Sequence, residues 1–172
     1  FAVTGTNGKT SFTHLLAQAL SSSSAKCGLI GTMGSGVPGA LIDPGLTTPA
    51  AIDIQRKLRE FVDSGCEAVV LEASSHGLVQ GRLGNIRVGT AVLTNITHDH
   101  LDYHGTFESY LRAKERLFHI DSVSNAVLNL DDEFGSDLAA GLSAGVRVIG
   151  YSLKKETDVS LIEAAATDFG VE

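Results

Sequence analysis

The chain has 172 residues, of which 43% are hydrophobic, and this length supports one domain with a substantial core rather than two. Its formal net charge of -7 argues against a nucleic-acid partner, because such a surface needs a basic field. No apolar run approaches the roughly 20 residues needed to cross a bilayer, so we expect a soluble protein without membrane insertion.

The chain begins with a short apolar strand that runs into a glycine-rich turn and then a helix. Gly5 and Gly8 can take backbone conformations closed to other residues, so consecutive N–H groups can point at an anion on the positive end of the helix. Lys9 would neutralise the terminal phosphates and Thr10 would offer its hydroxyl to Mg²⁺, although Val3 stands where a longer phosphate loop has glycine. A glycine turn without a ligand would explain neither Lys9 nor Thr10. The expected nucleotide contacts are Gly5, Thr6, Asn7, Gly8, Lys9, Thr10 and Ser11.

A helix, a strand and a long loop are expected next. The polar tract Ser21–Ser24 ends the helix, and a second strand follows over Cys27–Thr32. Met33–Leu46 has four glycines and two prolines without periodicity, which predicts a surface loop that reaches toward ligands. The two cysteines have neither metal-ligand spacing nor the density of a disulfide scaffold, so we expect a reducing cytoplasm.

The turn Thr47-Thr48-Pro49 introduces another helix. Thr48 suits the N-cap with Pro49 at the first helical position, and a binding role for Thr48 is equally open. The continuous apolar run Ala68–Leu71 predicts a strand that is buried on both faces of a parallel sheet. It ends at Glu72, whose carboxylate either meets a ligand at the carboxyl end of a central strand or serves as a cap or salt bridge.

Two polar stretches follow the later strands. The residues Ala73–Gly81, followed by Arg82, carry small polar side chains that suit a binding loop. Thr90–Thr94 is a further buried strand, and it leads into Asn95–His104, where three imidazoles and two carboxylates crowd together. Both a metal site and a solvated loop fit that composition.

Lys114 stands in the apolar stripe of a helix predicted over Thr106–Ile120. It must either snorkel to the edge, which is normally favoured, or sit where its amine loses solvation and its pKa falls. Asp131 or Asp132 is expected to cap a later helix, and Asp131 to lie near the nucleotide. The elements predicted after Lys114 are a strand over Ala126–Leu128, a helix over Glu133–Leu142, a strand over Val146–Tyr151 and the start of a further β element over Val159–Glu172.

This alternation of strands and helices predicts an α/β fold with a doubly wound, mainly parallel sheet. The stretches Gly5–Thr10, Glu72–Ser74 and Asn95–His100 all follow strands, so they should converge on one edge of the sheet. Both ends of the sequence look cut. We therefore interpret residues 1–172 as one domain excerpted from a longer polypeptide, with the C-terminal part of the domain truncated.

Four motifs together resemble the central ATPase domain of the Mur ligases. They are the loop Gly5–Thr10, the turn Thr47-Thr48-Pro49, the segment Glu72–Leu78 and the segment Asp99–Gly105 followed by Lys114. The segment Ser74–Leu78 with Gln80 and Arg82 is most similar to the branch that adds the third amino acid of the peptidoglycan stem peptide. Leu46 departs from the asparagine that is frequent there, and the resemblance is thin after about 132.

The resemblance implies an ADP-forming amide ligase of bacterial, cytoplasmic peptidoglycan synthesis. ATP would phosphorylate the D-glutamate carboxylate of UDP-MurNAc-L-Ala-D-Glu, and the amine of a diamino acid, meso-diaminopimelate or L-lysine, would attack the acyl phosphate. A UDP-binding N-terminal domain and an amino-acid-binding C-terminal domain would be missing, so the fragment alone should be inactive. We expect a monomer by default.

The resemblance also implies roles for single residues. Lys9, His100 and Lys114 would be catalytic. Thr10 and Glu72 would hold a first Mg²⁺, and His100 a second one with Lys114, which the family carries in carbamylated form. The implied contacts to the muramoyl dipeptide are Thr47, Thr48, Ser74, Gln80 and Arg82.

Three other classes share some of these features. Folylpolyglutamate synthetase shares the phosphate loop and metal residues but would not be expected to carry Ser74–Leu78. A phosphate-loop switch protein would need neither Lys114 nor the Thr47-Thr48-Pro49 turn. A non-catalytic nucleotide-binding module would be marked by loss of the catalytic lysines, Glu72 or His100, and all of these are present.

Overall fold

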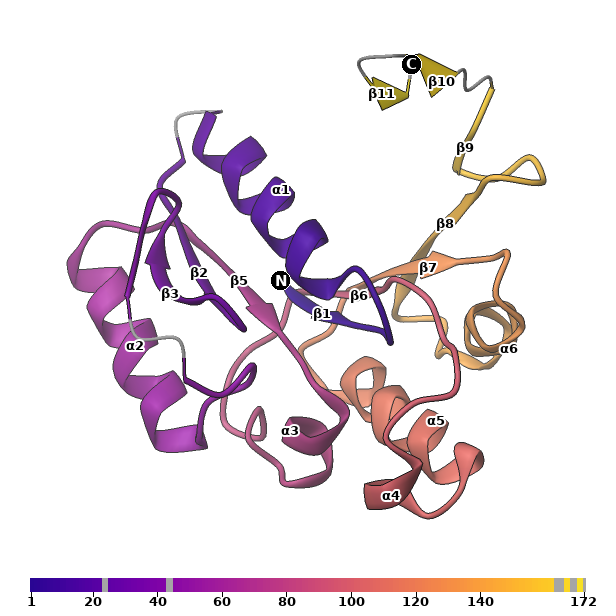
Figure 1. Cartoon of the computed structure of the whole chain (residues 1–172), viewed down its shortest axis with the longest axis horizontal. Coiled ribbons are helices and arrows are strands. Elements are labelled where there is room, and N and C mark those ends of the chain that lie inside the picture. Colours follow the sequence, from indigo (N-terminus) through magenta and orange to yellow (C-terminus); the bar gives the residue numbers. More distant parts are fainter. Residues whose placement is uncertain (23–24, 43–44, 163–165, 168–169, 172) are drawn as a thin grey trace.

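In the computed structural model the described residues form a nine-stranded, mainly parallel sheet with helices on both faces (Figure 1). The structure describes residues 1–22, 25–42, 45–162, 166–167 and 170–171. The strands are β1 Ala2–Thr4, β2 Cys27–Gly31, β3 Gly34–Val37, β4 Ala40–Ile42, β5 Ala68–Glu72, β6 Thr90–Leu93, β7 Asn125–Asn129, β8 Arg147–Ser152 and β9 Val159–Ser160. The helices are α1 Lys9–Ser22, α2 Ala51–Asp63, α3 Ser75–Val79, α4 Leu101–His104, α5 Phe107–Glu115, the 3-10 helix η1 Arg116–His119 and α6 Glu133–Gly141.

The strand order, β4-β3-β2-β5-β1-β6-β7-β8-β9, confirms the doubly wound prediction. From β1 the chain first moves to β2 on one side, and later returns through β5 to β6 on the other side. Ligands of open α/β sheets bind in the crevice at the carboxyl ends of the strands where the winding reverses. The loops that follow β1, β5 and β6 therefore meet at the expected place.

Two apolar cores cover the two faces of the sheet. On one face, the apolar side of α1 packs against Val3, Val70 and Val92 of the central strands. On the other face, α2, α3, η1 and α6 pack against residues such as Leu71 and Leu93. Because Val70 and Leu71 are neighbours in β5 and point to opposite faces, the run Ala68–Leu71 is apolar without alternation, as predicted for a strand buried on both sides.

The loop predicted over Met33–Leu46 is largely wrong. β3 and β4 form an antiparallel edge there, joined to β2 and to each other by tight turns at Thr32–Met33 and Pro38–Gly39. The many glycines hid strands whose side chains give no alternating pattern, since Gly34 and Gly36 occupy paired positions in β3. Residues 43–44 of this stretch lie outside the described residues.

Several predicted boundaries shift. The helix after Pro49 starts at Ala51 with Ala50 at its N-cap and no side-chain cap, so the capping role for Thr48 is wrong. The helix predicted over Thr106–Ile120 is capped by Thr106 and tightens into η1 in its last turn. The Asp132 carboxylate caps α6, one of the two alternatives predicted.

The end of α1 and the C-terminal stretch agree with the predictions where they can be compared. The tract Ser21–Ser24 ends α1, which reaches Ser22, while residues 23–24 lie outside the described residues. Within 159–172, β9 joins the sheet, and β10 Ala166–Thr167 pairs with β11 Gly170–Val171. Residues 161–162 of that predicted β element are in no strand, and residues 163–165, 168–169 and 172 lie outside the described residues.

Candidate active site

The phosphate loop joins β1 to α1 and depends on two glycines with positive φ. Gly5 has φ 146° and Gly8 has φ 81°. A Cβ on Gly5 would lie 1.9 Å from the Thr94 Oγ1, so no other residue fits there. The first N–H groups of a helix have no intrahelical acceptor and carry the positive end of its dipole. The start of α1 therefore offers donors that suit an anion.

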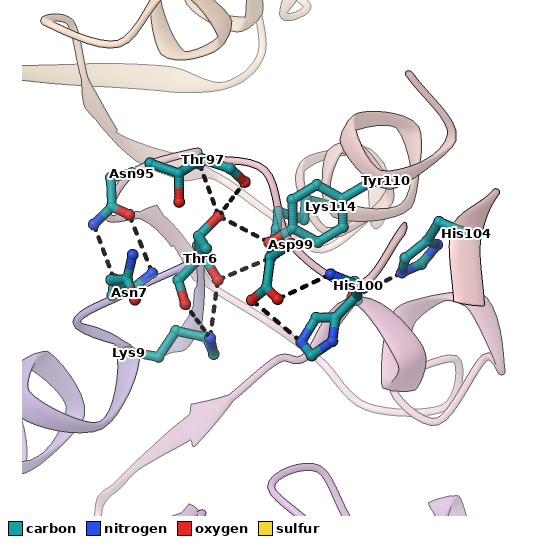
Figure 2. Close-up of polar contacts among 12 residues, drawn as sticks. Thr6, Asn7, Lys9, Asn95, Thr97, Asp99, His100, His104, Tyr110 and Lys114 are labelled. Carbon is teal, nitrogen blue, oxygen red and sulfur yellow. Dashed lines mark hydrogen bonds and ion pairs between the residues drawn. The ribbon is translucent and has the colours of Figure 1, made fainter. Parts of the chain in front are cut away.

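The carbonyl groups of the loop are held from three directions (Figure 2). The Lys9 ammonium folds back and donates to the carbonyl oxygens of Gly5 at 2.9 Å and Thr6 at 3.0 Å. The Asn95 side chain brackets Asn7, since its Oδ1 accepts from the Asn7 N–H at 3.1 Å and its Nδ2 donates to the Asn7 carbonyl at 2.9 Å. Burial lowers the pKa of Lys9, and the charges of nearby carboxylates oppose that shift.

Lys114 reaches the same loop from α5 and does not snorkel. Its side chain is 1% exposed, its Nζ donates to the Gly5 carbonyl at 2.8 Å, and it lies 4.5 Å from the centre of the Tyr110 ring. Desolvation, with repulsion from Lys9 in second place, lowers the pKa of Lys114 to about 7, while Asp99 opposes the shift. The Tyr110 hydroxyl, 2.8 Å from Thr6 Oγ1, completes this contact between α5 and the loop. Lys114 is thus an amine that is substantially neutral near pH 7.

Glu72 is fully buried at the end of β5 and its carboxylate accepts three hydrogen bonds. The Thr10 hydroxyl donates to Oε2 at 3.0 Å. Thr32, in the turn after β2, donates to both oxygens, with its N–H to Oε1 and its hydroxyl to Oε2, each at 3.0 Å. The sequence prediction missed Thr32, although it ends a parallel strand at the same sheet edge as Glu72. The same positional argument that singled out Glu72 could have found it.

The five predicted substrate-binding residues lie in one connected group. Thr47 Oγ1 is 3.0 Å from Thr32 Oγ1. The Thr48 hydroxyl donates to the Glu72 carbonyl at 2.7 Å and accepts from the Ser74 N–H at 2.9 Å. Arg82 donates to the Thr48 carbonyl, and its Nε donates to the Gln80 Oε1 at 3.0 Å. We call Thr10, Thr32, Thr47, Thr48, Ser74 and Glu72 the hydroxyl network.

A third cluster follows β6 and contains the predicted histidines. His100 has φ 51°, a left-handed conformation that is uncommon for residues other than glycine. Its N–H donates to the Asp99 Oδ1 at 2.9 Å, and its Nε2 lies 3.4 Å from the Asp99 Oδ2 (Figure 2). The His76 ring lies 5.0 Å from that of His100 and 3.9 Å from that of Tyr103, which lines up aromatic groups beside the loop. Burial lowers the pKa of His76.

The donors at this edge fit Mg²⁺ better than a metal that needs a complete protein cage. In the described part of the chain, no group of three or more His, Cys, Asp or Glu side chains could hold a metal ion. Mg²⁺ keeps several waters and takes one or two carboxylates together with substrate phosphates. The Glu72 carboxylate and the Thr10 hydroxyl, beside the phosphate loop, are donors of that kind.

The Asp131 carboxylate lies against the end of β8. It accepts from the Ser152 hydroxyl at 2.6 Å and from the Leu153 N–H at 2.7 Å, and these hydrogen bonds lower its pKa. These contacts fasten the end of β8, and the position of Asp131 near a nucleotide stays a prediction.

Comparison with known proteins agrees with this geometry. A family model described as the Mur ligase middle domain matches residues 3–172. The chain belongs to this family. It is 46% identical over 171 residues to the UDP-N-acetylmuramoyl-L-alanyl-D-glutamate--2,6-diaminopimelate ligase of Chromobacterium violaceum, an alignment that covers 99% of this chain and 34% of that protein.

Solved structures extend the comparison. A structure of a UDP-N-acetylmuramoyl-L-alanyl-D-glutamate--2,6-diaminopimelate ligase superposes with a TM-score of 0.91 and 40% identity, and covers 99% of this chain and 35% of that chain. E. coli FolC in complex with DHPP and ADP has a TM-score of 0.64 at 21% identity, covering 100% of this chain and 47% of that chain, and shares the fold alone. This Mur ligase middle domain thus spans about a third of the ligases it matches.

Three further residues of this Mur ligase middle domain act on the site without having been assigned to it from sequence. Thr32 holds Glu72, Asn95 holds the phosphate loop, and Tyr110 reaches Thr6. Asn95 fell inside a stretch interpreted as a possible metal loop, and Tyr110 within an apolar stripe. In the described residues, no helix is long and apolar enough to span a membrane.

Proposed function

We propose that this chain is the ATP-binding domain of a ligase that joins a diamino acid to the D-glutamate of UDP-MurNAc-L-Ala-D-Glu, in bacterial cytoplasmic peptidoglycan synthesis. The observation that carries the proposal is that the phosphate loop, Glu72 and the contacts of Thr48 with Glu72 and Arg82 meet at one sheet edge. Two relatives at 46% and 51% identity, both named as 2,6-diaminopimelate ligases, support 2,6-diaminopimelate as the added amino acid.

In this proposal the loop residues bind the nucleotide. The N–H groups at the start of α1 would receive the phosphates of ATP, and Lys9 would exchange its two carbonyl contacts for the terminal phosphates. Thr10 and Glu72 would hold one Mg²⁺, and His100 with Lys114 a second. Bound Mg²⁺ would offset the charge that gathers as the phosphoryl group is transferred.

The hydroxyl network and Arg82 would place the carboxylate that is to be activated. A carboxylate is a poor electrophile near pH 7, so its phosphorylation supplies a leaving group for the attacking amine. Arg82 offers a planar fork that matches carboxylate geometry, and Gln80 already fixes that fork in direction. We place the binding of uridine and of the incoming amine in other parts of the full-length protein, since the matched ligases are longer than this chain.

Lys114 is proposed to carry a carbamate. Its neutral amine would attack the carbon of CO₂, forming an N–C bond and releasing one proton, and the product is an anion instead of a cation. Burial and the pKa of about 7 support this step, because only the neutral amine is nucleophilic. A bare ammonium would repel a nearby metal ion, whereas a carbamate would attract it.

The test is ADP release by the full-length protein with ATP, Mg²⁺ and UDP-MurNAc-L-Ala-D-Glu, comparing meso-diaminopimelate with L-lysine. We expect release that requires the dipeptide and is faster with meso-diaminopimelate. Faster release with a folate and glutamate would favour a folylpolyglutamate synthetase. No ADP release with either the muramoyl dipeptide or the folate would favour a non-catalytic nucleotide-binding module. The 172-residue chain alone should form no amide bond and bind nucleotide weakly.

A further inference from the structure

Thr32 occupies a turn whose geometry is fixed by strand pairing. Gly31 pairs with Gly34 across β2 and β3, so Thr32 and Met33 form a two-residue turn at the carboxyl end of β2. From this position Thr32 uses both its N–H and its hydroxyl on the Glu72 carboxylate. A Cβ on Gly31 would lie 2.2 Å from Glu72 Oε1. The turn is therefore shaped to receive this carboxylate.

The hydroxyl hydrogens define a direction along the network. A threonine hydroxyl has one proton to donate, and an ionised carboxylate only accepts. Thr32 spends its proton on Glu72, so the contact of 3.0 Å between Thr47 and Thr32 requires Thr47 to be the donor. The chain of donation runs from Thr47 through Thr32 to the carboxylate, and such chains strengthen each of their members.

A second connection joins the same two segments. The Thr48 hydroxyl donates to the Glu72 carbonyl at 2.7 Å, and Thr48 is buried. The turn that carries Thr47 and Thr48 thus contacts Glu72 in two ways. Thr48 contacts its main-chain carbonyl directly, and Thr47 contacts its carboxylate through Thr32. Of these two connections, only the one through Thr32 reaches the oxygens that a cation would contact.

We infer that Thr32 is a positioning residue that couples the Thr47–Thr48 turn to the Glu72 carboxylate, so that dipeptide binding and Mg²⁺ binding reinforce each other. The inference rests on the proposed function for the identity of both ligands. A dipeptide that orders Thr47 also orders its hydrogen bond to Thr32, and hence the orientation of the carboxylate. By reciprocity, Mg²⁺ at Glu72 should tighten dipeptide binding by the same factor.

The test uses the full-length protein and a fluorescent ATP analogue, whose binding is titrated with Mg²⁺ in the presence and absence of the muramoyl dipeptide. In the wild type, dipeptide should lower the half-saturating Mg²⁺ concentration about fivefold or more. Thr32→Val keeps the N–H and removes the hydroxyl, so it should raise that concentration about tenfold and bring the effect of dipeptide close to none. Thr32→Ser keeps the hydroxyl, so its half-saturating Mg²⁺ concentration and its response to dipeptide should be those of the wild type. Thr157→Val removes a hydroxyl that donates to Val159 at the far edge of the sheet and should change neither.

Two further readouts separate coupling from structural support. Thr47→Val should abolish the dipeptide effect and raise the Mg²⁺ requirement by less than Thr32→Val does, because Thr32 keeps its own donors to Glu72. Combining the two substitutions should change the Mg²⁺ titration little beyond the effect of Thr32→Val alone. If Thr32→Val lowers the melting temperature but leaves the Mg²⁺ titration and its dipeptide response as in the wild type, the inference is wrong. A wild type that shows no dipeptide-dependent ADP release contradicts the proposed function instead, and the Mg²⁺ titration without dipeptide then still decides whether Thr32 positions Glu72.

Discussion

The phosphate loop and the hydroxyl network share one sheet edge but are held in opposite ways. The loop is held mainly by its carbonyl oxygens, which accept from Lys9, Lys114 and Asn95. Its Thr6 and Asn7 N–H groups donate to Asn95, and the N–H groups at the start of α1 have no intrahelical acceptor. In the hydroxyl network the donors are used within the protein, since the hydroxyls of Thr10 and Thr32 donate to the Glu72 carboxylate. The loop is thus prepared to exchange contacts when an anion arrives, whereas the network is already formed and needs little reordering.

The largest effect is expected from a substitution that removes the contact of Lys114 with the phosphate loop. Lys114→Ala in the full-length enzyme should lower turnover about a hundredfold or more, because it removes the proposed carbamate and its metal contact. Formate or acetate, as small carboxylates, should restore part of the activity. Steady-state ADP release with and without these anions measures both effects. A fully active variant, or a plain lysine in high-resolution density at saturating bicarbonate and Mg²⁺, would remove the carbamate from the proposal.

Glu72→Gln changes the residue that accepts the hydrogen bonds of the hydroxyl network. The amide keeps the volume and can still accept from a threonine hydroxyl, but it lacks the charge that draws Mg²⁺. We expect turnover to fall by about ten- to a hundredfold with a raised Mg²⁺ requirement, and the melting temperature to change much less. The exposed Glu156→Gln is the matched control. Near-normal turnover at saturating Mg²⁺ would show that Glu72 is no metal ligand, and His100→Ala gives the same comparison for the second ion.

Gly31→Ala tests the shape of the network without removing a polar group. The new methyl group would lie 2.2 Å from Oε1 and 2.9 Å from Cδ of Glu72, and the buried carboxylate would have to leave its Thr32 donors. The half-saturating Mg²⁺ concentration should rise about tenfold. Gly89→Ala, where nothing lies within 4 Å of the added Cβ, should behave as the wild type. Equal Mg²⁺ titrations of the two variants would mean that the carboxylate is not confined there.

The smallest effect is a pH dependence of stability. Between the folded pKa of Lys114, about 7, and its ordinary 10.5, the unfolded chain binds a proton that the folded chain has lost. Stability should therefore rise with pH across this window relative to Lys114→Met, by at most about 1.4 kcal/mol per pH unit. Below the folded pKa, the free energies of unfolding of the two proteins should change with pH in parallel. Urea unfolding in carbonate-free buffer measures the slopes, and parallel curves throughout would refute a depressed pKa.

Much of this edge followed from sequence because it rests on strand ends. The apolar runs before Gly5, Glu72 and Asn95 gave the parallel strands, and parallel strands bring their carboxyl ends together. The apolar stripe of its helix singled out Lys114 but left snorkelling and burial as alternatives, and the structure decides for burial. The glycine-rich β3 and the three-residue β4 could not be predicted, because antiparallel pairing there is made by backbone groups that leave no side-chain pattern. Thr32 could have been found because it directly follows a parallel strand at the edge where Glu72 lies, although its hydrogen bonds to the carboxylate depend on a turn set by that pairing.

The antiparallel edge formed by β2, β3 and β4 has two turns that differ in what they can tolerate. The turn at Thr32–Met33 is held to its length by the pairing of Gly31 with Gly34, so one inserted residue would carry Thr32 away from the carboxylate. The turn at Pro38–Gly39, where Val37 pairs with Ala40, lies at the opposite end of β3 from Glu72, and Gly39 has open space around its Cβ position. For protein engineering, a fluorescent label or an inserted peptide tag belongs at Pro38–Gly39, where it can follow the edge of the sheet without altering the site that this edge supports.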